Sequence, residues 1–281
     1  MVEEDRQDAP ELPAAVIGLL QRLYRDPRYL LVGVVQRYGR ERISFIECCT
    51  ILSATGDVRG QALLNAEYEI QGRPDGEHPY GEESLLDFYL RRRTPEPVEL
   101  DEDELAALRD ESWQYYVRRN FLFLLGRYDR AREDADHNLG IWNLVERSSA
   151  SEEAKWSYLK WWPWIERDRA VAQALWDLQQ GDAEQAATEL YRAQKAIVQF
   201  GERHAEEYAA EEGDGSSLCS QMAQHIAALV ELLRREKLLP ISLDERMEAA
   251  QSRGDQEEME RLREELIRRT MEDGDGVTGP E

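Results

Sequence analysis

The side chains best suited to chemistry lie in one loop that is rich in glycine and proline. This loop carries Arg73, Asp75, His78 and Tyr80. A histidine titrates near neutral pH, so it can carry a proton in acid–base catalysis, and loops often hold functional residues. The sequence places no nucleophile beside His78. The loop is therefore a candidate site, and an enzyme acting there is one of three functional hypotheses.

The rest of the sequence holds no recognisable catalytic or metal motif. The other histidines, at 137, 204 and 225, do not pair with ligands at helical spacing, and Cys48, Cys49 and Cys219 lack the spaced partners of a zinc site. Glycine-rich nucleotide-binding loops and the serine-hydrolase elbow are also missing. We therefore predict no catalytic residue, no metal and no cofactor.

A second candidate site is a segment dense in tryptophan. It contains Trp156, Trp161, Trp162 and Trp164, interrupted by Pro163. Tryptophans are good anchors for a bound peptide, so these four could line a groove. Large aromatic side chains also dominate packed helix interfaces. The packed interface is the favoured interpretation, and the groove stays open.

Two long helical hairpins organise the middle of the chain, from Leu105 to Phe200. Apolar residues recur at spacings of three, four and seven on both sides of turns at Gly126 and Gly181. Hairpins of this kind bury their apolar faces against neighbouring helices. This region therefore favours a binding surface over a catalytic pocket.

The N-terminal part predicts a different, mixed structure. A helix is expected from Ala14 to Tyr24. Alternating and β-branched residues then predict an antiparallel β-meander, and an amphipathic helix follows. The strands span Tyr29–Val35, Ile43–Leu52 and Leu63–Gln71, a turn spans Gly56–Gly60, and the last helix spans Glu82–Arg93.

These patterns predict a mainly α protein in four parts. Residues 1–96 form a small α+β domain, which the linker Thr94–Pro97 ends because proline disfavours helix at the residue before it. Residues 97–239 form stacked helical hairpins similar to tetratricopeptide repeats. Residues 240–272 form a helical hairpin, and residues 273–281 form a disordered acidic tail.

Composition limits the classes of partner. The chain has 58 acidic and 35 basic side chains, which gives a net charge of −23. Such a surface repels the phosphates that dominate nucleic-acid affinity. No apolar run approaches the roughly 20 residues that span a bilayer, and the acidic start lacks the positive region of a signal peptide. We expect a cytoplasmic protein that binds neither nucleic acid nor membrane.

The C-terminal hairpin carries a resemblance to a known family. Its leucines, methionines and arginine resemble the UvrB/UvrC motif, or UVR motif, an antiparallel helical hairpin of nucleotide-excision-repair subunits, Clp unfoldase components and their adaptors. The segment Gly72–Gly76 and the residues up to Tyr89 resemble bacterial UVR-motif proteins with a helical middle. The resemblance implies partner binding through Leu243, Met247, Ala250, Met259, Leu262, Arg263 and Leu266.

Three functions follow from these observations. The favoured one is a non-enzymatic adaptor that binds a protein, either another UVR-motif protein or a second copy of itself. The first alternative is an accessory factor of nucleotide-excision repair that contacts the UvrA, UvrB or UvrC proteins. The second alternative is the enzyme with a site near the loop from Arg73 to Tyr80.

Overall fold

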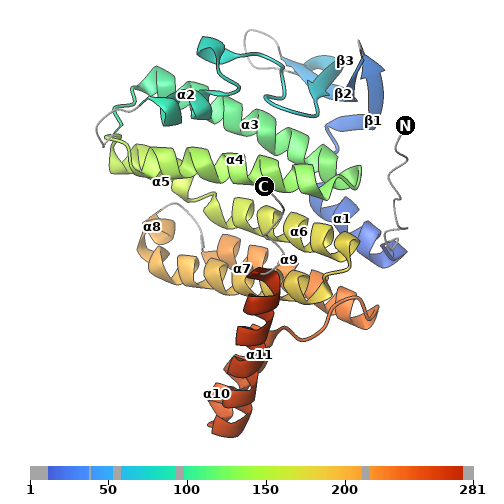
Figure 1. The fold of residues 1–281 in the computed structure, drawn as a ribbon. Coiled ribbons are helices and arrows are strands. Elements are labelled where there is room, and N and C mark those ends of the chain that lie inside the picture. The colour runs from blue at the N-terminus through green and yellow to red at the C-terminus, as the bar shows by residue number, and fades with distance from the viewer. Residues whose placement is uncertain (1–11, 38, 53–57, 93–97, 211–215, 275–281) are drawn as a thin grey trace, which may run out of the picture.

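The computed structural model describes residues 12–37, 39–52, 58–92, 98–210 and 216–274. As predicted, the protein is mainly helical, with a three-stranded antiparallel sheet near the N-terminus followed by helical hairpins (Figure 1). The expected linker Thr94–Pro97 lies outside the described residues, as does the expected tail except for its first two residues.

The sheet is a meander in the order β1-β2-β3. Helix α1 (Ala14–Tyr24) precedes β1 (Tyr29–Arg37), β2 (Arg40–Leu52) and β3 (Val58–Glu69). The predicted turn at Gly56–Gly60 is wrong in its second half, because β3 already begins at Val58. There Val58 pairs with Leu52 and Gly60 pairs with Ile51, so backbone pairing extends through the glycine.

The helices form the rest of the molecule, as stacked layers beneath the sheet in Figure 1. After the short η1 (Pro79–Gly81) they are α2 (Leu85–Arg91), α3 (Glu102–Leu124), α4 (Tyr128–Glu146), α5 (Glu152–Leu159), α6 (Trp162–Gln180), α7 (Ala183–Arg203), α8 (Ala205–Ala210), α9 (Ser216–Arg235), α10 (Leu243–Arg253) and α11 (Gln256–Gly274).

Both predicted glycine turns are confirmed. Gly126 joins α3 to α4 with a φ of 70°, and Gly181 joins α6 to α7 with a φ of 85°. Residues that carry a Cβ rarely adopt this left-handed backbone conformation, so glycine is favoured where the chain reverses. Pro163 lies in the first turn of α6, where its missing N–H costs no helical hydrogen bond.

The sheet and the helices share one hydrophobic core. Buried residues of α1 and β2 belong to the same cluster as buried residues of α3, α4, α6, α7 and α9. Ile70, directly after β3, is also a member, and Ala66 and Tyr68 of β3 are partly buried against it. Phe45 of β2 packs on Phe121 of α3 with ring centroids 4.7 Å apart, and Tyr24 of α1 stacks on Phe123 at 3.8 Å. The predicted parts 1–96 and 97–239 therefore meet across a continuous apolar interior.

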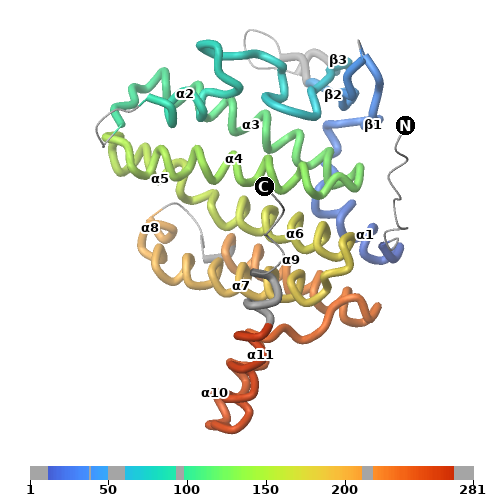
Figure 2. The backbone as a smooth tube through the Cα atoms, viewed as in Figure 1, coloured from blue at the N-terminus to red at the C-terminus, as the bar shows by residue number. Residues whose placement is uncertain are grey.

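The C-terminal hairpin stands apart from that core. Helices α10 and α11 project from the helical layers (Figures 1 and 2), and their buried residues form a small separate cluster. The predicted break is confirmed at Gly254, which has a φ of 69°. Across all described residues, no helix combines the length and apolarity needed to cross a bilayer.

Candidate functional site

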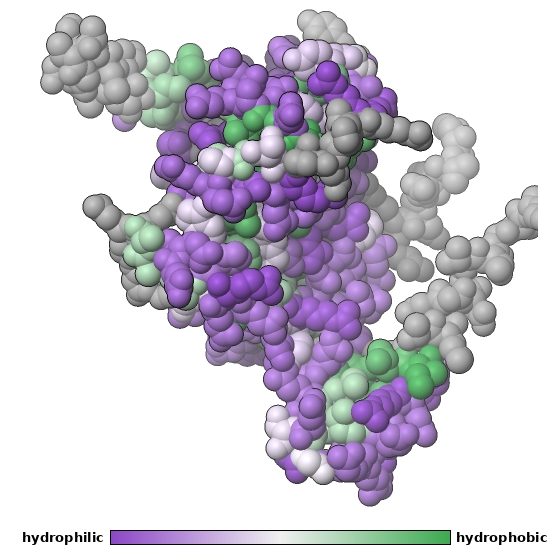
Figure 3. All heavy atoms as spheres, turned by 90° about the vertical axis from the view of Figure 1, so that its left-hand side faces the viewer, coloured by the Kyte–Doolittle hydropathy of each residue, from purple (hydrophilic) through white to green (hydrophobic). Residues whose placement is uncertain are grey.

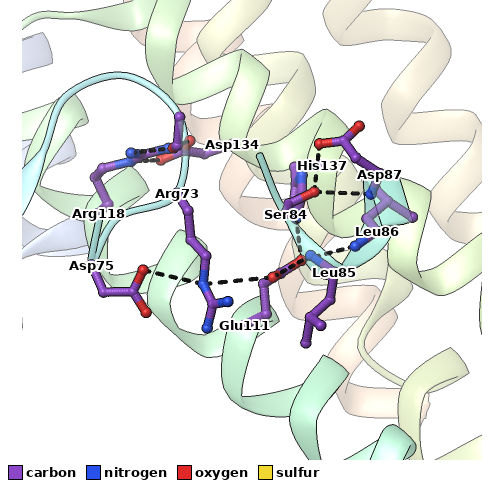
Figure 4. Close-up of polar contacts among 11 residues, drawn as sticks. Arg73, Asp75, Ser84, Leu85, Leu86, Asp87, Glu111, Arg118, Asp134 and His137 are labelled. Atoms are coloured by element: carbon purple, nitrogen blue, oxygen red, sulfur yellow. Dashed lines mark hydrogen bonds and ion pairs between the residues drawn. The ribbon is translucent and has the colours of Figure 1, made fainter. Parts of the chain in front are cut away.

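The loop from Arg73 to Tyr80 is fixed to the helices by two buried ionic contacts (Figure 4). In the first, Arg118 of α3 binds Asp134 of α4, with Nε to Oδ2 at 3.0 Å and Nη2 to Oδ1 at 2.6 Å. The same guanidinium donates through Nη1 to the carbonyl oxygens of Glu69 and Gly72, both at 2.8 Å. Arg118 thus ties the end of β3 and the start of the loop to the helical layers.

The second contact centres on Glu111, whose side chain is fully buried. Its carboxylate accepts hydrogen bonds from the backbone N–H groups of Leu85 at 2.8 Å and Leu86 at 3.2 Å. It also lies 3.0 Å from His137 Nε2 and 3.7 Å from Arg73 Nε. An anion at the start of a helix satisfies free N–H groups and complements the helix dipole. Glu111 therefore holds α2 and the loop together.

The remaining candidate loop residues differ in their contacts. Asp75 accepts from the Glu77 N–H at 3.0 Å and lies 3.2 Å from Arg73 Nε. Tyr80 is exposed and stacks on Phe88 at 4.2 Å. His78 is exposed, and its ring has no hydrogen bond or ion pair with any residue in the described ranges. The loop thus supplies His78 with no described partner for proton transfer.

A second buried ionic group lies between α3, α6 and α9. Asp168 is shared by two arginines: its Oδ2 lies 2.8 Å from Arg119 Nη2, and its Oδ1 accepts from Arg167 Nε at 2.9 Å. All three side chains are almost completely buried. We call Arg119, Arg167 and Asp168 the arginine–aspartate triad. Two cations and one anion leave it with one net positive charge.

The groups around the triad do not neutralise that charge. Arg167 Nη1 lies 3.0 Å from His225 Nδ1, and because arginine only donates, that nitrogen must be an acceptor. Burial, and then repulsion by Arg167, lower the pKa of His225. Burial, and then the negative charge of Asp168, raise the pKa of the neighbouring Tyr24 hydroxyl. His225 and Tyr24 are therefore neutral partners.

The tryptophan-rich segment divides between a cavity and the packed interior. A cavity of about 480 Å³ lies among α3, α4, α5 and α6, and Trp161 and Trp164 form part of its wall. Trp162 instead stacks on Phe200 at 4.7 Å, and Trp156 packs against Tyr208 at 4.9 Å. The candidate groove residues thus do not lie together. Trp161 and Trp164 line this cavity, which we call the aromatic cavity. Trp162 packs on α7, and Trp156 packs on α8.

The wall of the aromatic cavity combines rings with a few polar groups. Its aromatic members are Trp113, Tyr116, Trp142, Tyr158, Trp161 and Trp164, and its polar members are Arg109, Ser112, Arg119, Asn138 and Ser157. With its amide oxygen turned toward Arg119, Asn138 accepts from Nη1 at 3.0 Å and donates to Ser112 at 3.2 Å. The Trp164 indole N–H is buried and has no acceptor in the described part of the chain.

The predicted docking residues of the C-terminal hairpin fall into two groups. Leu243, Ala250 and Leu262 are buried, and Met247 and Met259 pack against them. Arg263 and Leu266 face outward: Arg263 lies 3.6 Å from Glu260, and Leu266 is exposed, as is its neighbour Ile267. The first group holds the two helices together, and the second lies on the hairpin's surface.

Sequence reasoning missed the buried charges, although a signal for them exists. Arg118 and Arg119 lie on α3 between the apolar residues Val117 and Phe121. Glu111 lies on the same helix. Charged residues in the middle of an apolar helical face are expensive to bury and need partners. Within the described residues, no group of three or more histidine, cysteine or acidic side chains could hold a metal ion.

Comparisons with known proteins add no further assignment: no protein-family model, curated protein or solved structure matches this chain. The geometry of the loop, the aromatic cavity and the hairpin therefore carries the functional argument.

Proposed function

We propose that this chain is a non-enzymatic adaptor that binds a protein partner through its projecting hairpin, α10–α11. The partner presents a helical hairpin of the same amphipathic type, as the resemblance to the UVR motif implies. The supporting observation is that the hairpin is a separate unit, built on a small core and extending away from the helical layers (Figure 1).

The hairpin leaves apolar surface available for such a partner. Ile267 on α11 is 56% exposed, and Met247 and Met259 are only partly buried. Figure 3 shows hydrophobic residues gathered on the projecting hairpin, surrounded by hydrophilic ones. Exposed apolar patches rimmed by polar residues are typical of interaction sites. A second pair of helices would cover this patch and complete a four-helix interface.

The hairpin is attached to the body by polar contacts, which leave its apolar residues out of that attachment. Arg192 and Lys195 of α7 pair with Asp244 and Glu248 of α10, both at 2.5 Å. Glu184 of α7 accepts from the Leu243 N–H at 2.8 Å. Exposed ion pairs of this kind contribute little free energy, so they fix the direction of the hairpin more than its stability.

The loop from Arg73 to Tyr80 supports a non-enzymatic role. Its arginine and aspartate belong to contacts that hold the loop in place, and His78 has no described partner. We place the protein in the cytoplasm, because Cys48, Cys49 and Cys219 are all free thiols, which a reducing compartment maintains.

The test uses the full chain and two probes: a second copy of the chain, by sedimentation equilibrium, and purified UvrB, by calorimetric titration. We expect association with at least one probe at low micromolar concentration. Ile267→Asp should weaken it at least tenfold. The matched control is Ile241→Asp, because Ile241 is 59% exposed but lies outside both hairpin helices.

Two results would contradict the proposal. The first is the absence of association with either probe at high micromolar concentration. The second is association that Ile267→Asp leaves unchanged, since binding would then use another surface. Binding to UvrB in particular would favour the repair alternative, in which the adaptor meets the repair proteins through the same hairpin.

A further inference from the structure

The aromatic cavity lies against an uncompensated buried positive charge. Arg119 forms part of the cavity wall and is also a member of the arginine–aspartate triad. The triad holds two cations and one anion, and its neighbours His225 and Tyr24 are neutral. Charges interact more strongly in a protein interior than in water. The triad therefore favours an anion in the adjoining space, in a protein whose net charge is −23.

The open side of the cavity carries a second cation. Arg109 is an exposed member of the wall, with its guanidinium 5.4 Å from the ring centre of Tyr158. It forms no ion pair with a carboxylate in the described ranges. Trp113 and Trp161 flank this side and are 48% and 49% exposed. The entrance thus presents aromatic faces and an arginine that can form an ion pair with an acidic group of a ligand.

We propose that the aromatic cavity binds a small planar aromatic carboxylate. The walls are rings that can stack on an aromatic body, and the volume of about 480 Å³ falls within the range of small-molecule sites. Arg109 at the entrance and the triad beneath it both attract a negative group. Ser112 supplies a hydroxyl group for orientation, whereas the Ser157 hydroxyl already donates to the Ala154 carbonyl at 2.6 Å and offers a ligand only its oxygen as acceptor.

A cationic ligand fits these observations less well, although aromatic cages commonly bind cations. The ring faces already carry cations of the protein itself: Arg167 lies 5.0 Å from the Trp164 ring centre, and Lys160 lies 5.8 Å from that of Trp161. A ligand cation would meet their repulsion and that of Arg109 and Arg119. The cavity therefore selects for negative charge on an aromatic body.

This site is independent of the adaptor proposal, because it lies among α3 to α6 and shares no residue with α10–α11. It would give the helical body a ligand of its own. Failure of hairpin docking and failure of ligand binding are separate results, measured with different probes.

The experiment is calorimetric titration of the full chain at pH 7.5 with a matched pair of probes, 1-naphthaleneacetate and 1-naphthaleneacetamide. The two differ in charge and share the aromatic body. We expect one site per chain and at least tenfold tighter binding of the carboxylate. Trp161→Ala should weaken both probes at least tenfold, because it removes a stacking surface.

Charge selection is tested by Arg109→Gln. This variant should weaken the carboxylate at least threefold and leave the amide unchanged. The matched control is Arg253→Gln on the projecting hairpin, which should change neither. Circular dichroism checks that each variant keeps the wild-type fold. No carboxylate binding at 5 mM (on the order of the weakest specific affinities), equal affinity for the two probes, or binding that Trp161→Ala leaves unchanged would overturn the proposal.

Discussion

Glu111 is a charged side chain whose environment is made entirely by protein groups. Its carboxylate lies at the N-terminus of α2, against two backbone N–H groups, His137 and Arg73. Burying a carboxylate is costly unless its partners replace the lost water. Three hydrogen-bonding groups and the nearby Arg73 cation do so here, and together they hold the loop from Arg73 to Tyr80 against the helices.

The first prediction concerns this carboxylate. Glu111→Gln keeps the size of the side chain but removes its charge. The ion pair with Arg73 is lost, and the hydrogen bonds from His137 and the backbone N–H groups of α2 are weakened. We expect a loss of about 2–3 kcal/mol in the free energy of unfolding, measured with urea.

The matched control is Glu133→Gln, because Glu133 is exposed and, within the described residues, forms its ion pair with Arg130 one turn away. It should change the free energy of unfolding by less than about 0.5 kcal/mol. Equal effects of the two substitutions would mean that Glu111 is not the anchor of α2.

The second prediction concerns pH. The pKa of His225 lies below its ordinary value of 6.5, because burial and Arg167 disfavour its charged form. Above about pH 6.5 the ring is neutral in both the folded and the unfolded chain. As the pH falls below 6.5, the unfolded chain takes up a proton that the folded chain resists, so stability is progressively lost toward the folded-state pKa.

The measurement compares unfolding at pH 7.5 and pH 5 for the wild type and His225→Gln. The variant should lose less stability on acidification, because glutamine can accept from Arg167 without titrating. Asp177 acts with the opposite sign, since burial raises its pKa to about 6 and its contribution is lost as the pH rises. Both proteins keep Asp177, so their difference isolates His225. His78→Gln is the control at an exposed histidine, and identical acid sensitivity in wild type and His225→Gln would contradict the assignment.

The sequence predicted least about the partners of individual side chains. Buried hydrophobic residues follow helical spacing, so the apolar faces of the hairpins between Leu105 and Phe200 could be assigned to the interior in advance. Leu243 and Leu262 were expected to bind a partner, and in the structure they are buried between α10 and α11. The partners of Arg118 and Glu111 could not be assigned in advance, because Asp134 and the N-terminus of α2 are brought to them only by the tertiary fold. A pattern shows that a charge must be paired, and the three-dimensional arrangement determines with what.

Close helix contacts decide which glycines can be replaced. Gly201 of α7 and Gly18 of α1 both lie inside helices, where alanine is intrinsically preferred by about 1 kcal/mol. A Cβ at Gly201 would come within 2.8 Å of Cys219 Cβ on α9, whereas a Cβ at Gly18 would meet only the flexible end of Arg22 at 3.7 Å. The two sites therefore differ in the room available for a Cβ and not in backbone conformation.

The third prediction follows from that difference. Gly201→Ala should destabilise the protein by about 1–2 kcal/mol, because the cost of separating α7 from α9 exceeds the gain in helix propensity. Gly18→Ala should stabilise it by about 0.5–1 kcal/mol. Thermal unfolding measures both. A stabilising effect of Gly201→Ala would mean that α7 and α9 can move apart freely.

The C-terminal hairpin gives the fourth prediction. Its core has three buried residues and two partly buried methionines, and each fully buried apolar side chain contributes roughly 1.5–3 kcal/mol. Ordering its residues costs about 1–2 kcal/mol each in backbone entropy. A peptide of residues 240–272 should therefore be largely unfolded by itself and gain helicity only with a partner. Circular dichroism in a dilution series measures this, and strong helicity that persists at low micromolar concentration would show that the hairpin is self-sufficient.

Elements were the level at which the sequence was most informative. The helix Ala14–Tyr24 has the predicted bounds, and the turns at Gly126, Gly181 and Gly254 are where glycine indicated them. The helix predicted from Glu82 begins instead at Leu85, because Ser84 caps it by accepting from the Asp87 N–H. Local capping and register, as at Val58 in β3, depend on neighbours that periodicity does not contain.

The whole molecule combines a large core shared by the sheet and the helices, a smaller apolar cluster among α2, α3, α4 and α5, and a projecting hairpin with a small cluster of its own. Composition and periodicity predicted a mixed α+β region followed by a helical region, and both are present. They did not predict that the sheet would pack on α3 through Phe45 and Phe121, because a hydrophobic pattern identifies a buried face without naming the face that covers it. The shared core has a measurable consequence for how the protein unfolds.

All seven tryptophans lie between residues 113 and 176, so their fluorescence reports mainly on the helical layers. Trp113 also lies beside the N-terminal part, with the Arg28 guanidinium 5.7 Å from its ring centre. Ile43 lies in β2, belongs to the shared core and is fully buried. Removing most of its side chain costs about 2–5 kcal/mol through lost burial and the cavity left behind. If sheet and helices unfold as one cooperative unit, that cost must appear in a fluorescence signal whose tryptophans all lie outside the sheet.

The fifth prediction is therefore that Ile43→Ala lowers the urea midpoint reported by tryptophan fluorescence, and that circular dichroism gives the same midpoint. Ile267→Ala is the control, because Ile267 is exposed on the projecting hairpin and lies outside the shared core. It should leave the tryptophan transition unchanged. If Ile43→Ala also left that transition unchanged, the N-terminal part would unfold independently, and the continuous interior would not couple the sheet to the helices.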